Sequence, residues 1–342
     1  MSEMTLWRAL NDGLRSAMAE DARVFIMGEE LTRWGAGGGI HGVTRGLLAE
    51  FGPGRVRDTP ISEEGILAAG VGAALCGCRP VVEIMYSDFS LLGFDPIVNQ
   101  AAKIRYKFGG QFDVPLVIRS NTGWGAGKAA QHTQSLETLF AHIPGLEVVL
   151  PSTPHDARGL LRSSILSPNP TIFLEHKNLY NVRGLVDDTP VPLGVGRVAR
   201  KGRDVTIVAT QLMLHRSIAV ADRLAADGID IEIVDPRTLY PLDLDTIVTS
   251  VRHTRRVLVC HEAPVLYGFG AEIASSITEA CWRELDVPVR RLGGARTPMP
   301  YAAELEDEVI PSEARIEAAV RGLVTGNRAR AEDSGVKTFD KD

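Results

Sequence analysis

Two adjacent carboxylates, Glu63 and Glu64, stand just before residues 66–78, a stretch that carries no charge. Ser62 in front of them is a good helix N-cap, and the helix dipole favours carboxylates in a first turn. The segment that follows is rich in glycine and alanine, which suits a helix packed closely against another backbone. A carboxyl group at the rim of such a dry interface is costly unless its proton is used, so Glu63 is our candidate acid. The alternative, that both acids only complement the helix dipole, stays open.

More polar side chains follow the predicted strands. Ligands of open α/β sheets bind beyond the carboxyl ends of the strands, so residues at these positions are candidates for a binding site. They are Glu29 and Glu30 after the first strand, and Tyr86, Asp88 and Phe89 after a later one.

His132 lies near the end of a glycine-rich segment, residues 121–134, that follows the predicted strand 115–120. A lone histidine is commonly structural or exposed. Its place beyond a strand, at the start of a predicted helix, makes a catalytic role about as plausible, and both interpretations stay open.

Residues 37–42, GGGIHG, match the pattern G-x-G-x-x-G. A dinucleotide site needs these glycines directly between a strand and its helix, whereas the preceding strand is predicted to end near Gly28. A loop is therefore the better interpretation than a nicotinamide site. The chain also has no G-x-S-x-G, H-E-x-x-H or Walker pattern, and no Gly-Asp-Gly followed by paired asparagines.

The bulk composition excludes several classes of protein. Of 342 residues, 44% are hydrophobic and 23% charged, with a formal charge of −6, which argues against a nucleic-acid partner. The longest uncharged run is too short to span a bilayer, and the first residues lack the layout of a secretion signal. Four cysteines without metal spacing indicate reduced thiols in a cytoplasmic protein.

Short apolar runs alternate with helical patterns along the chain, which indicates parallel sheets covered on both faces. The predicted strands are 23–28, 80–85, 115–120, 146–150, 171–176, 204–210, 229–235, 255–262 and 287–293. The predicted helices, besides the one after Ser62, are 88–106, 154–167, 213–227, 243–252 and 270–285. The fold class is α/β with two doubly wound domains, over residues 1–185 and 203–325, joined by a linker (186–202) and followed by a polar tail (326–342).

Several long segments, in order, carry a resemblance to a known family. They are residues 28–30, 43–66, 79–89, 99–106, 129–137, 142–161, 170–180, 234–243 and 261–274. From residue 5 to about 322, the chain resembles the β subunit of the thiamine-diphosphate-dependent first component of 2-oxo acid dehydrogenase complexes. That group includes the pyruvate, branched-chain 2-oxo acid and acetoin dehydrogenases.

The resemblance implies a pyrimidine-binding domain of thiamine-diphosphate enzymes, followed by a domain like the C-terminal domain of transketolases. It implies an α2β2 heterotetramer in which thiamine diphosphate lies at the α/β interface and the α subunit holds the diphosphate and Mg²⁺. This chain has no Gly-Asp-Gly pattern, which agrees with a cofactor site of which it supplies only the pyrimidine half. A lipoyl-bearing acyltransferase would receive the acyl group.

The resemblance also implies roles for individual residues. Glu63 would hydrogen-bond the aminopyrimidine nitrogen of the cofactor, and His132 would act as an acid on the substrate or the lipoyl group. The remaining cofactor positions are Glu29, Ile61, Ser62, Met85 and Phe89, and Tyr86 is a substrate position.

Some relatives hold a structural K⁺, mostly through main-chain oxygens. The matching positions are Leu116, Ser164, Ile165, Ser167 and Asn169. Here Ser167 and Pro168 replace an acidic and polar pair, a departure from the family's pattern.

The expected activity is oxidative decarboxylation of pyruvate or a branched-chain 2-oxo acid. The alternative substrate is acetoin, which the phrases CGCRP (76–80) and KIRYKFGG (103–110) favour. The loops 32–42 and 119–128 differ from the pyruvate type. An alternative of another class is an assembly subunit without catalysis of its own.

Overall fold

The computed structural model describes residues 1–33, 37–125 and 127–326. The predicted tail therefore lies outside the described residues except for Gly326, as do residues 34–36 of the loop 32–42 and Ala126 of the loop 119–128. The chain forms two compact units. The first contains Met1–Thr122, Leu139–Leu193 and Leu239–Pro241, and the second contains Gly123–Thr138, Gly194–Thr238 and the chain from Leu242 onward.

The first unit is built on a seven-stranded sheet. In spatial order its strands are β12 (Thr238–Tyr240), β6 (Glu147–Val149), β7 (Thr171–His176), β5 (Val117–Thr122), β4 (Arg79–Ile84), β2 (Val24–Glu29) and β3 (Val56–Thr59). All pairings from β6 to β3 are parallel. Nearly every residue of β2, β4, β5 and β7 is buried, which explains why apolar residues predominate in these strands without a polar face.

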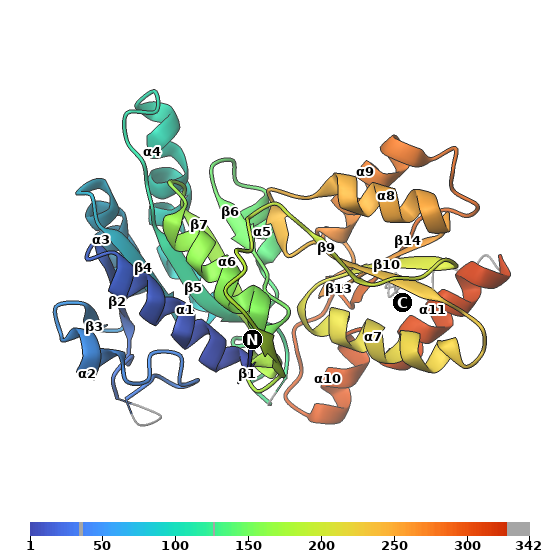
Figure 1. Ribbon diagram of the computed structural model, residues 1–342, viewed down its shortest axis with the longest axis horizontal. Helices are drawn as coiled ribbons and strands as arrows, with labels where there is room; N and C mark the ends of the chain where they lie inside the picture. Colours follow the sequence, from blue (N-terminus) through green and yellow to red (C-terminus); the bar gives the residue numbers. More distant parts are fainter. Residues whose placement is uncertain (34–36, 126, 327–342) are drawn as a thin grey trace, which may run out of the picture. The chain divides into compact units, whose positions relative to one another are not determined.

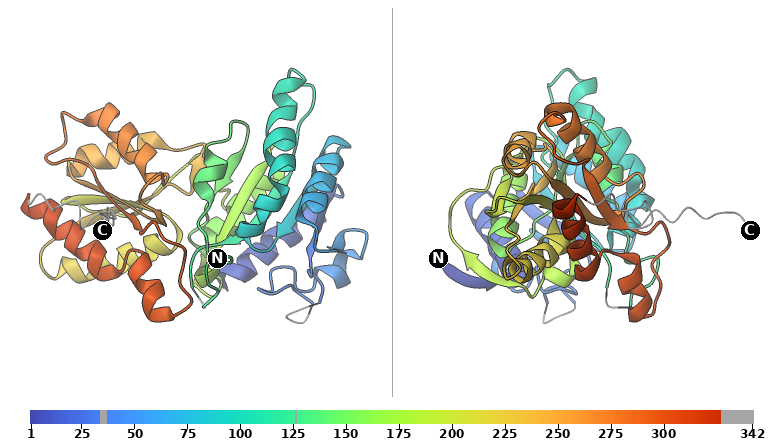
Figure 2. Two further views of the ribbon diagram at one scale, coloured as in Figure 1. Left: turned by 180° about the vertical axis from the view of Figure 1, so that it is seen from behind. Right: turned by 90° about the vertical axis from the view of Figure 1, so that its right-hand side faces the viewer.

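Helices cover both faces of this sheet (Figures 1 and 2). The α-helices of this half of the chain are α1 (Leu6–Glu20), α2 (Leu47–Phe51), α3 (Glu63–Leu75), α4 (Ala102–Lys107), α5 (Glu137–Ala141) and α6 (Pro154–Leu166). Helices α1 and α6 pack against each other in front of the sheet in Figure 1. A short 3₁₀ helix, η3 (Lys177–Leu179), leads to β8 (Arg183–Val186), which pairs antiparallel with β1 (Ser2–Thr5).

The predicted single helix over residues 88–106 is broken. The chain instead forms a 3₁₀ helix η1 (Ser87–Gly93), a π-helix η2 (Pro96–Ala101) and then α4. A Cβ at Gly93 would lie 3.1 Å from the carbonyl oxygen of Glu63, so the first of these elements ends where it touches the backbone of α3. Pro96 opens the next element, because its ring is tolerated at a helix start.

The second unit has a five-stranded sheet. Its order is β14 (Arg290–Gly294), β13 (Val257–Pro264), β10 (Val205–Ala209), β11 (Ile231–Asp235) and β9 (Arg197–Arg200). Only β9, which lies within the segment predicted to be a linker, runs antiparallel to its neighbour. Helices α8 (Leu244–Thr254) and α9 (Gly270–Cys281) cover one face, and α7 (Gln211–Ala225) and α11 (Glu313–Thr325) the other (Figure 1). Helix α10 (Ala303–Val309) precedes α11.

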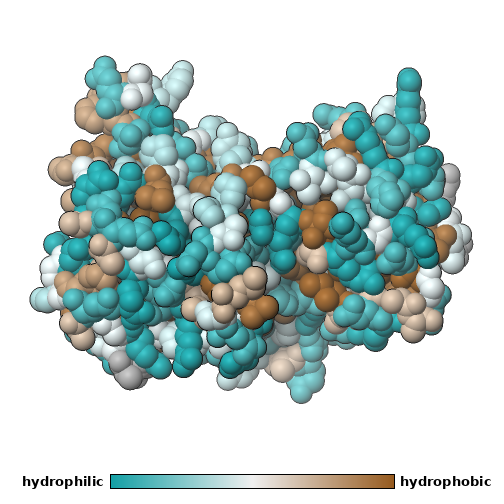
Figure 3. All heavy atoms as spheres, viewed as in Figure 1, coloured by the Kyte–Doolittle hydropathy of each residue, from teal (hydrophilic) through white to brown (hydrophobic). Residues whose placement is uncertain are grey.

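Both units are mainly parallel sheets between helices, which confirms the predicted α/β class. In the view of Figure 3, hydrophilic side chains predominate on the described surface and hydrophobic ones form small separate groups. Among the described residues, no helix has the length and apolar character needed to cross a bilayer.

Candidate active site

Helix α3 begins at Glu63, with Ser62 as its N-cap residue. The predicted helix start is confirmed, although the Ser62 hydroxyl makes no capping hydrogen bond. Glu63 is 8% exposed, whereas Glu64 is exposed. The two acids therefore differ: Glu64 lies in solvent at the positive end of the helix, and Glu63 points into the protein.

Glu63 is buried because it shares a helix face with apolar side chains. The buried positions of α3 are Glu63, Ile66, Leu67, Gly70, Val71 and Ala74, which recur at helical spacing. A Cβ at Gly70 would lie 2.8 Å from Val82 Cγ2, so α3 approaches the sheet closely there, as its small residues predict. Ala68, Ala69 and Gly72 lie on the exposed face of α3.

Glu29 at the end of β2 is the second buried carboxyl at this edge of the sheet. Its side chain is 8% exposed, and among the described residues its Oε1 has no hydrogen-bond partner. Burial, with smaller contributions from the charges of Glu63, Glu83 and Glu30, raises the pKa of Glu29 to about 7. The structure therefore brings Glu29 and Glu63 close enough to interact, and Glu29 takes up a proton near neutral pH.

The segment that follows β4 contributes the aromatic residues of this edge. Tyr86 is 8% exposed, and the Lys177 ammonium lies 5.4 Å from the centre of its ring. Burial, with a smaller effect of Asp88, raises the pKa of the Tyr86 hydroxyl. Met85 and Phe89 are partly exposed beside it, and the Phe89 amide donates to the Tyr86 carbonyl at 2.9 Å.

Neighbouring strands place these groups at one edge. In the order β4, β2, β3, the carboxyl ends of the strands are followed by Met85, by Glu30 and by the turn that leads to Glu63. Ile61 in this turn is 72% exposed, so its side chain is not part of the buried group. His132 belongs to the second unit, on the segment Gly123–Thr138, and is half-buried there.

A buried ion cluster on β4, β5 and β7 was not predicted from the sequence. The Arg119 guanidinium donates to both carboxylate oxygens of Glu175 at 2.7 and 2.8 Å, and to Glu83 Oε2 at 2.6 Å. The Tyr180 hydroxyl donates to Glu175 at 2.7 Å and accepts from the Asn121 amide. The sequence signal was one charge inside each of three predicted strands, Glu83, Arg119 and Glu175, but their pairing follows only from the strand order of the structure.

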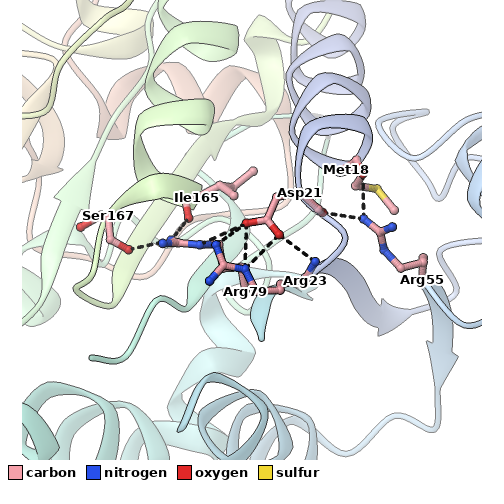
Figure 4. A network of polar contacts seen from close by, with 7 residues as sticks. All are labelled: Met18, Asp21, Arg23, Arg55, Arg79, Ile165 and Ser167. Atoms are coloured by element: carbon pink, nitrogen blue, oxygen red, sulfur yellow. Dashed lines mark hydrogen bonds and ion pairs between the residues drawn. The ribbon is translucent and has the colours of Figure 1, made fainter. Parts of the chain in front are cut away.

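The positions predicted for K⁺ do not fit a second cation well. Figure 4 shows Arg79 donating to the carbonyls of Ile165, at 2.6 Å, and Ser167, at 3.4 Å. The Leu116 carbonyl accepts the Thr171 amide at 2.9 Å. The side chain of Asn169 accepts from Arg105 at 2.8 Å and donates to Glu147 at 3.0 Å. The Ser164 carbonyl accepts the Ser167 amide at 3.2 Å.

Because the Arg79 guanidinium already brings a positive charge to two of these carbonyls, K⁺ would be repelled there. In the described part of the chain, moreover, His, Cys, Asp and Glu side chains nowhere gather in a group of three that could hold a metal ion.

The site fits the pyrimidine end of thiamine diphosphate. Two buried carboxyls, one of them with an unpartnered oxygen, offer donors and acceptors to a ring that carries several nitrogens. Partly exposed Met85 and Phe89 offer it an apolar surface.

Comparisons with known proteins identify the class. Residues 2–183 match the model of "Transketolase, pyrimidine binding domain", and residues 194–316 match "Transketolase, C-terminal domain". A solved split-gene transketolase, an inactive β4 tetramer, covers 95% of the chain with a TM-score of 0.78 at 21% identity, with all of its own chain matched. That likeness concerns the fold.

Curated relatives narrow the class to a family. The β subunit of acetoin:2,6-dichlorophenolindophenol oxidoreductase of Cupriavidus necator is 43% identical, over 95% of this chain and 99% of its own. The pyruvate dehydrogenase E1 β subunit of Rhizobium meliloti is 42% identical, over 94% and 70%. The 2-oxoisovalerate dehydrogenase β subunit of Bacillus subtilis is 39% identical, over 94% and 99%.

The chain thus belongs to the β subunits of the thiamine-diphosphate-dependent first components of 2-oxo acid and acetoin dehydrogenase complexes. The resemblance inferred from the sequence is confirmed. Its members are subunits of oxidoreductases, so the expectation that this chain is part of an enzyme is confirmed as well.

Proposed function

We propose that this chain is the catalytic β half of a 2-oxo acid dehydrogenase that decarboxylates pyruvate or a branched-chain 2-oxo acid. The observation that carries the proposal is the buried pair Glu29 and Glu63 at the carboxyl edge of a parallel sheet. An α subunit would complete an α2β2 heterotetramer and hold the diphosphate and Mg²⁺. A lipoyl-bearing acyltransferase would take up the acyl group.

When bound, thiamine diphosphate supplies a nucleophilic carbanion and an acceptor for the electrons released with carbon dioxide. Glu63 would hydrogen-bond the aminopyrimidine nitrogen and so favour the tautomer that can take up the thiazolium proton. Burial of Glu63 keeps water from competing for that hydrogen bond. Glu29, next to Glu63 and protonated near neutrality, limits the repulsion between the two carboxyl groups.

The other residues of the site would bind and orient. Met85 and Phe89 would contact the pyrimidine ring, with Ile61 and Ser62 as main-chain neighbours, while Tyr86 would face the substrate. His132, half-buried on its segment, would act as an acid toward the substrate or the lipoyl dithiolane. We do not include K⁺ in the proposal, because Arg79 engages the matching carbonyls.

Acetoin cleavage is the second candidate, because an acetoin oxidoreductase β subunit matches 99% of its own length at 43% identity. Co-purification with an α-like partner chain, followed by assays with pyruvate, branched-chain 2-oxo acids and acetoin, separates the two. Glu63→Gln in the reconstituted complex should lower turnover by about 100- to 10,000-fold. Normal turnover of this variant would instead favour an assembly subunit without catalysis of its own.

A further inference from the structure

The carboxyl end of β13 contains a β-bulge that changes the direction of one side chain. Cys260 pairs with Leu292 of β14, and the next pair joins Pro264 to Gly294. Three residues of β13, His261 to Ala263, therefore stand opposite the single residue Gly293. Such bulges are frequent beside active sites, where they redirect a side chain. The redirected side chain here is that of Glu262.

Two glycines of β14 make room for this bulge. A Cβ at Gly293 would lie 2.9 Å from the Ala263 carbonyl oxygen and 2.9 Å from His261 Cε1. A Cβ at Gly294 would lie 2.5 Å from the Glu262 carbonyl oxygen. Because no other residue type leaves this space, the Gly-Gly pair fixes the backbone that carries Glu262.

Glu262 holds both ends of the segment that bears His132. Its Oε1 accepts a hydrogen bond from the Trp124 amide at 2.6 Å and another from the Ser135 hydroxyl at 3.1 Å. Just beyond Ser135, the Thr138 hydroxyl oxygen accepts from the Phe269 amide at 3.0 Å. Hydrogen bonds to an ionised carboxylate are shorter and stronger than those between neutral groups. All of these residues belong to the second unit.

A cavity borders part of the segment. A cavity of about 470 Å³ is lined by Thr133, Gln134, Ser135, Glu262 and residues of the 294–299 stretch. Close to it, Glu137 is 5% exposed, and burial, with a smaller effect of the Glu262 charge, raises its pKa to about 7. Trp124 packs against the hydrophobic core of the second unit, whereas Gln134 and Ser135 line the cavity. Glu262 therefore joins the part of the segment beside the cavity to the part that is packed on the core.

We propose that Glu262 is a positioning residue: it fixes Trp124 and the described residues 127–138 to the bulge of β13 and thereby sets where the His132 side chain lies during turnover. The inference rests on the proposed function, because it takes His132 to act on the substrate or the lipoyl group.

The test uses the assembled complex with its acyltransferase and compares Glu262→Ala with Glu262→Gln. The alanine variant should lose about 10- to 100-fold in kcat, since small displacements of a reacting group have effects of this size. The glutamine variant should retain most of the activity, because its amide oxygen can still accept the hydrogen bonds from the Trp124 amide and the Ser135 hydroxyl. Glu272→Ala, on the exposed face of α9, is the matched control and should behave as the wild type.

A double-mutant cycle distinguishes positioning from general destabilisation. In a His132→Ala background, Glu262→Ala should cause no further loss of kcat. Losses that multiply, or a Glu262→Ala variant with wild-type kcat, would overturn the inference. If Glu262→Ala does not fold, Ser135→Ala takes its place in the same cycle, because it removes the hydrogen bond from the Ser135 hydroxyl to Glu262.

Hydrogen exchange separates this inference from the proposed function. Glu262→Ala should speed exchange of the amides between Gly127 and Thr138, whereas His132→Ala should not. If His132→Ala retains full turnover, the catalytic role of His132 fails. If exchange in Glu262→Ala is unchanged, the positioning role fails.

Discussion

Arg119 Nη1 lies 2.6 Å from Glu83 Oε2, across two neighbouring strands in which these residues are register partners. The same guanidinium binds both oxygens of Glu175, so one buried cation serves two buried carboxylates. Burial opposed by Arg119 leaves the pKa of Glu83 raised. Glu83 is the register partner of Gly28, the neighbour of Glu29, and its charge helps to raise the pKa of Glu29.

Arg119→Met should destabilise the chain strongly. The substitution keeps much of the side-chain volume but leaves the charges of Glu83 and Glu175 unpaired in the core, a change that costs about 3–5 kcal/mol in the free energy of unfolding. Urea unfolding of the isolated chain measures it. Arg183→Met removes an ion pair to Glu3 between exposed side chains and is the control, with little change expected. If the two variants lower the free energy of unfolding equally, the buried cluster contributes no more to stability than an exposed ion pair.

The pH dependence of stability should report on Glu29. Its pKa is about 7 in the folded chain and near 4.5 when unfolded. Between these values the folded state binds one more proton than the unfolded state, so the stability present below the lower value is lost as pH rises toward the upper one. A raised pKa of this size corresponds to about 3 kcal/mol.

Glu29→Gln should therefore be more stable than the wild type at pH 8 and little different at pH 4. Urea unfolding across this range checks the prediction. Glu137, whose pKa is also about 7, makes the same contribution to the pH dependence of stability in the variant and in the wild type, so its effect cancels in the comparison. If the free energy of unfolding of the variant changes with pH in parallel with that of the wild type, Glu29 titrates normally.

The sheet strands could be predicted because buried parallel strands are continuous apolar runs. Strand β3, with the charged residues Arg57 and Asp58, was missed because it lies at the edge of the sheet. The β1–β8 pair was missed because its strands have only four residues each and are largely exposed. The helix start at Glu63 followed from its cap and small residues. The Arg119 cluster could not be predicted, because the partners of a charged residue within an apolar run are known only once the strand order is known.

Gly93→Ala should disturb the start of α3. The added methyl would lie 2.2 Å from Leu67 Cδ1 and 3.1 Å from the Glu63 carbonyl oxygen. We expect a loss of about 1–3 kcal/mol in the free energy of unfolding, as for other overpacked sites. In the complex we also expect lower turnover, because the displaced backbone carries Glu63.

Gly72→Ala is the matched control on the same helix, because a Cβ there would meet nothing within 4 Å. Alanine favours a helix over glycine by about 1 kcal/mol, so this variant should stabilise the isolated chain. Destabilisation by both substitutions would show that α3 tolerates no added volume. The effect of Gly93→Ala could then not be assigned to the contact of Gly93 with Leu67 and Glu63.

Potassium should not stabilise the chain. The Arg79 guanidinium donates to the Ile165 and Ser167 carbonyls and lies 3.5 Å from Asp21 Oδ2, so the positive charge at these carbonyls comes from the protein itself (Figure 4). Thermal unfolding in KCl and in NaCl at equal ionic strength should give the same midpoint. A higher midpoint in KCl alone would show that a K⁺ ion binds in addition to Arg79.

The isolated chain should bind thiamine diphosphate only weakly. Its described residues include two buried carboxyls suited to the pyrimidine ring but, at 342 residues, the sequence has no Gly-Asp-Gly pattern to hold the diphosphate and Mg²⁺. Titration calorimetry with Mg²⁺ present should detect no micromolar binding until the α-like partner is added, and Glu63→Gln should weaken binding in the complex. Micromolar affinity of the β chain alone would mean that it carries a diphosphate site of its own, and the proposed division of the cofactor between two subunits would be wrong.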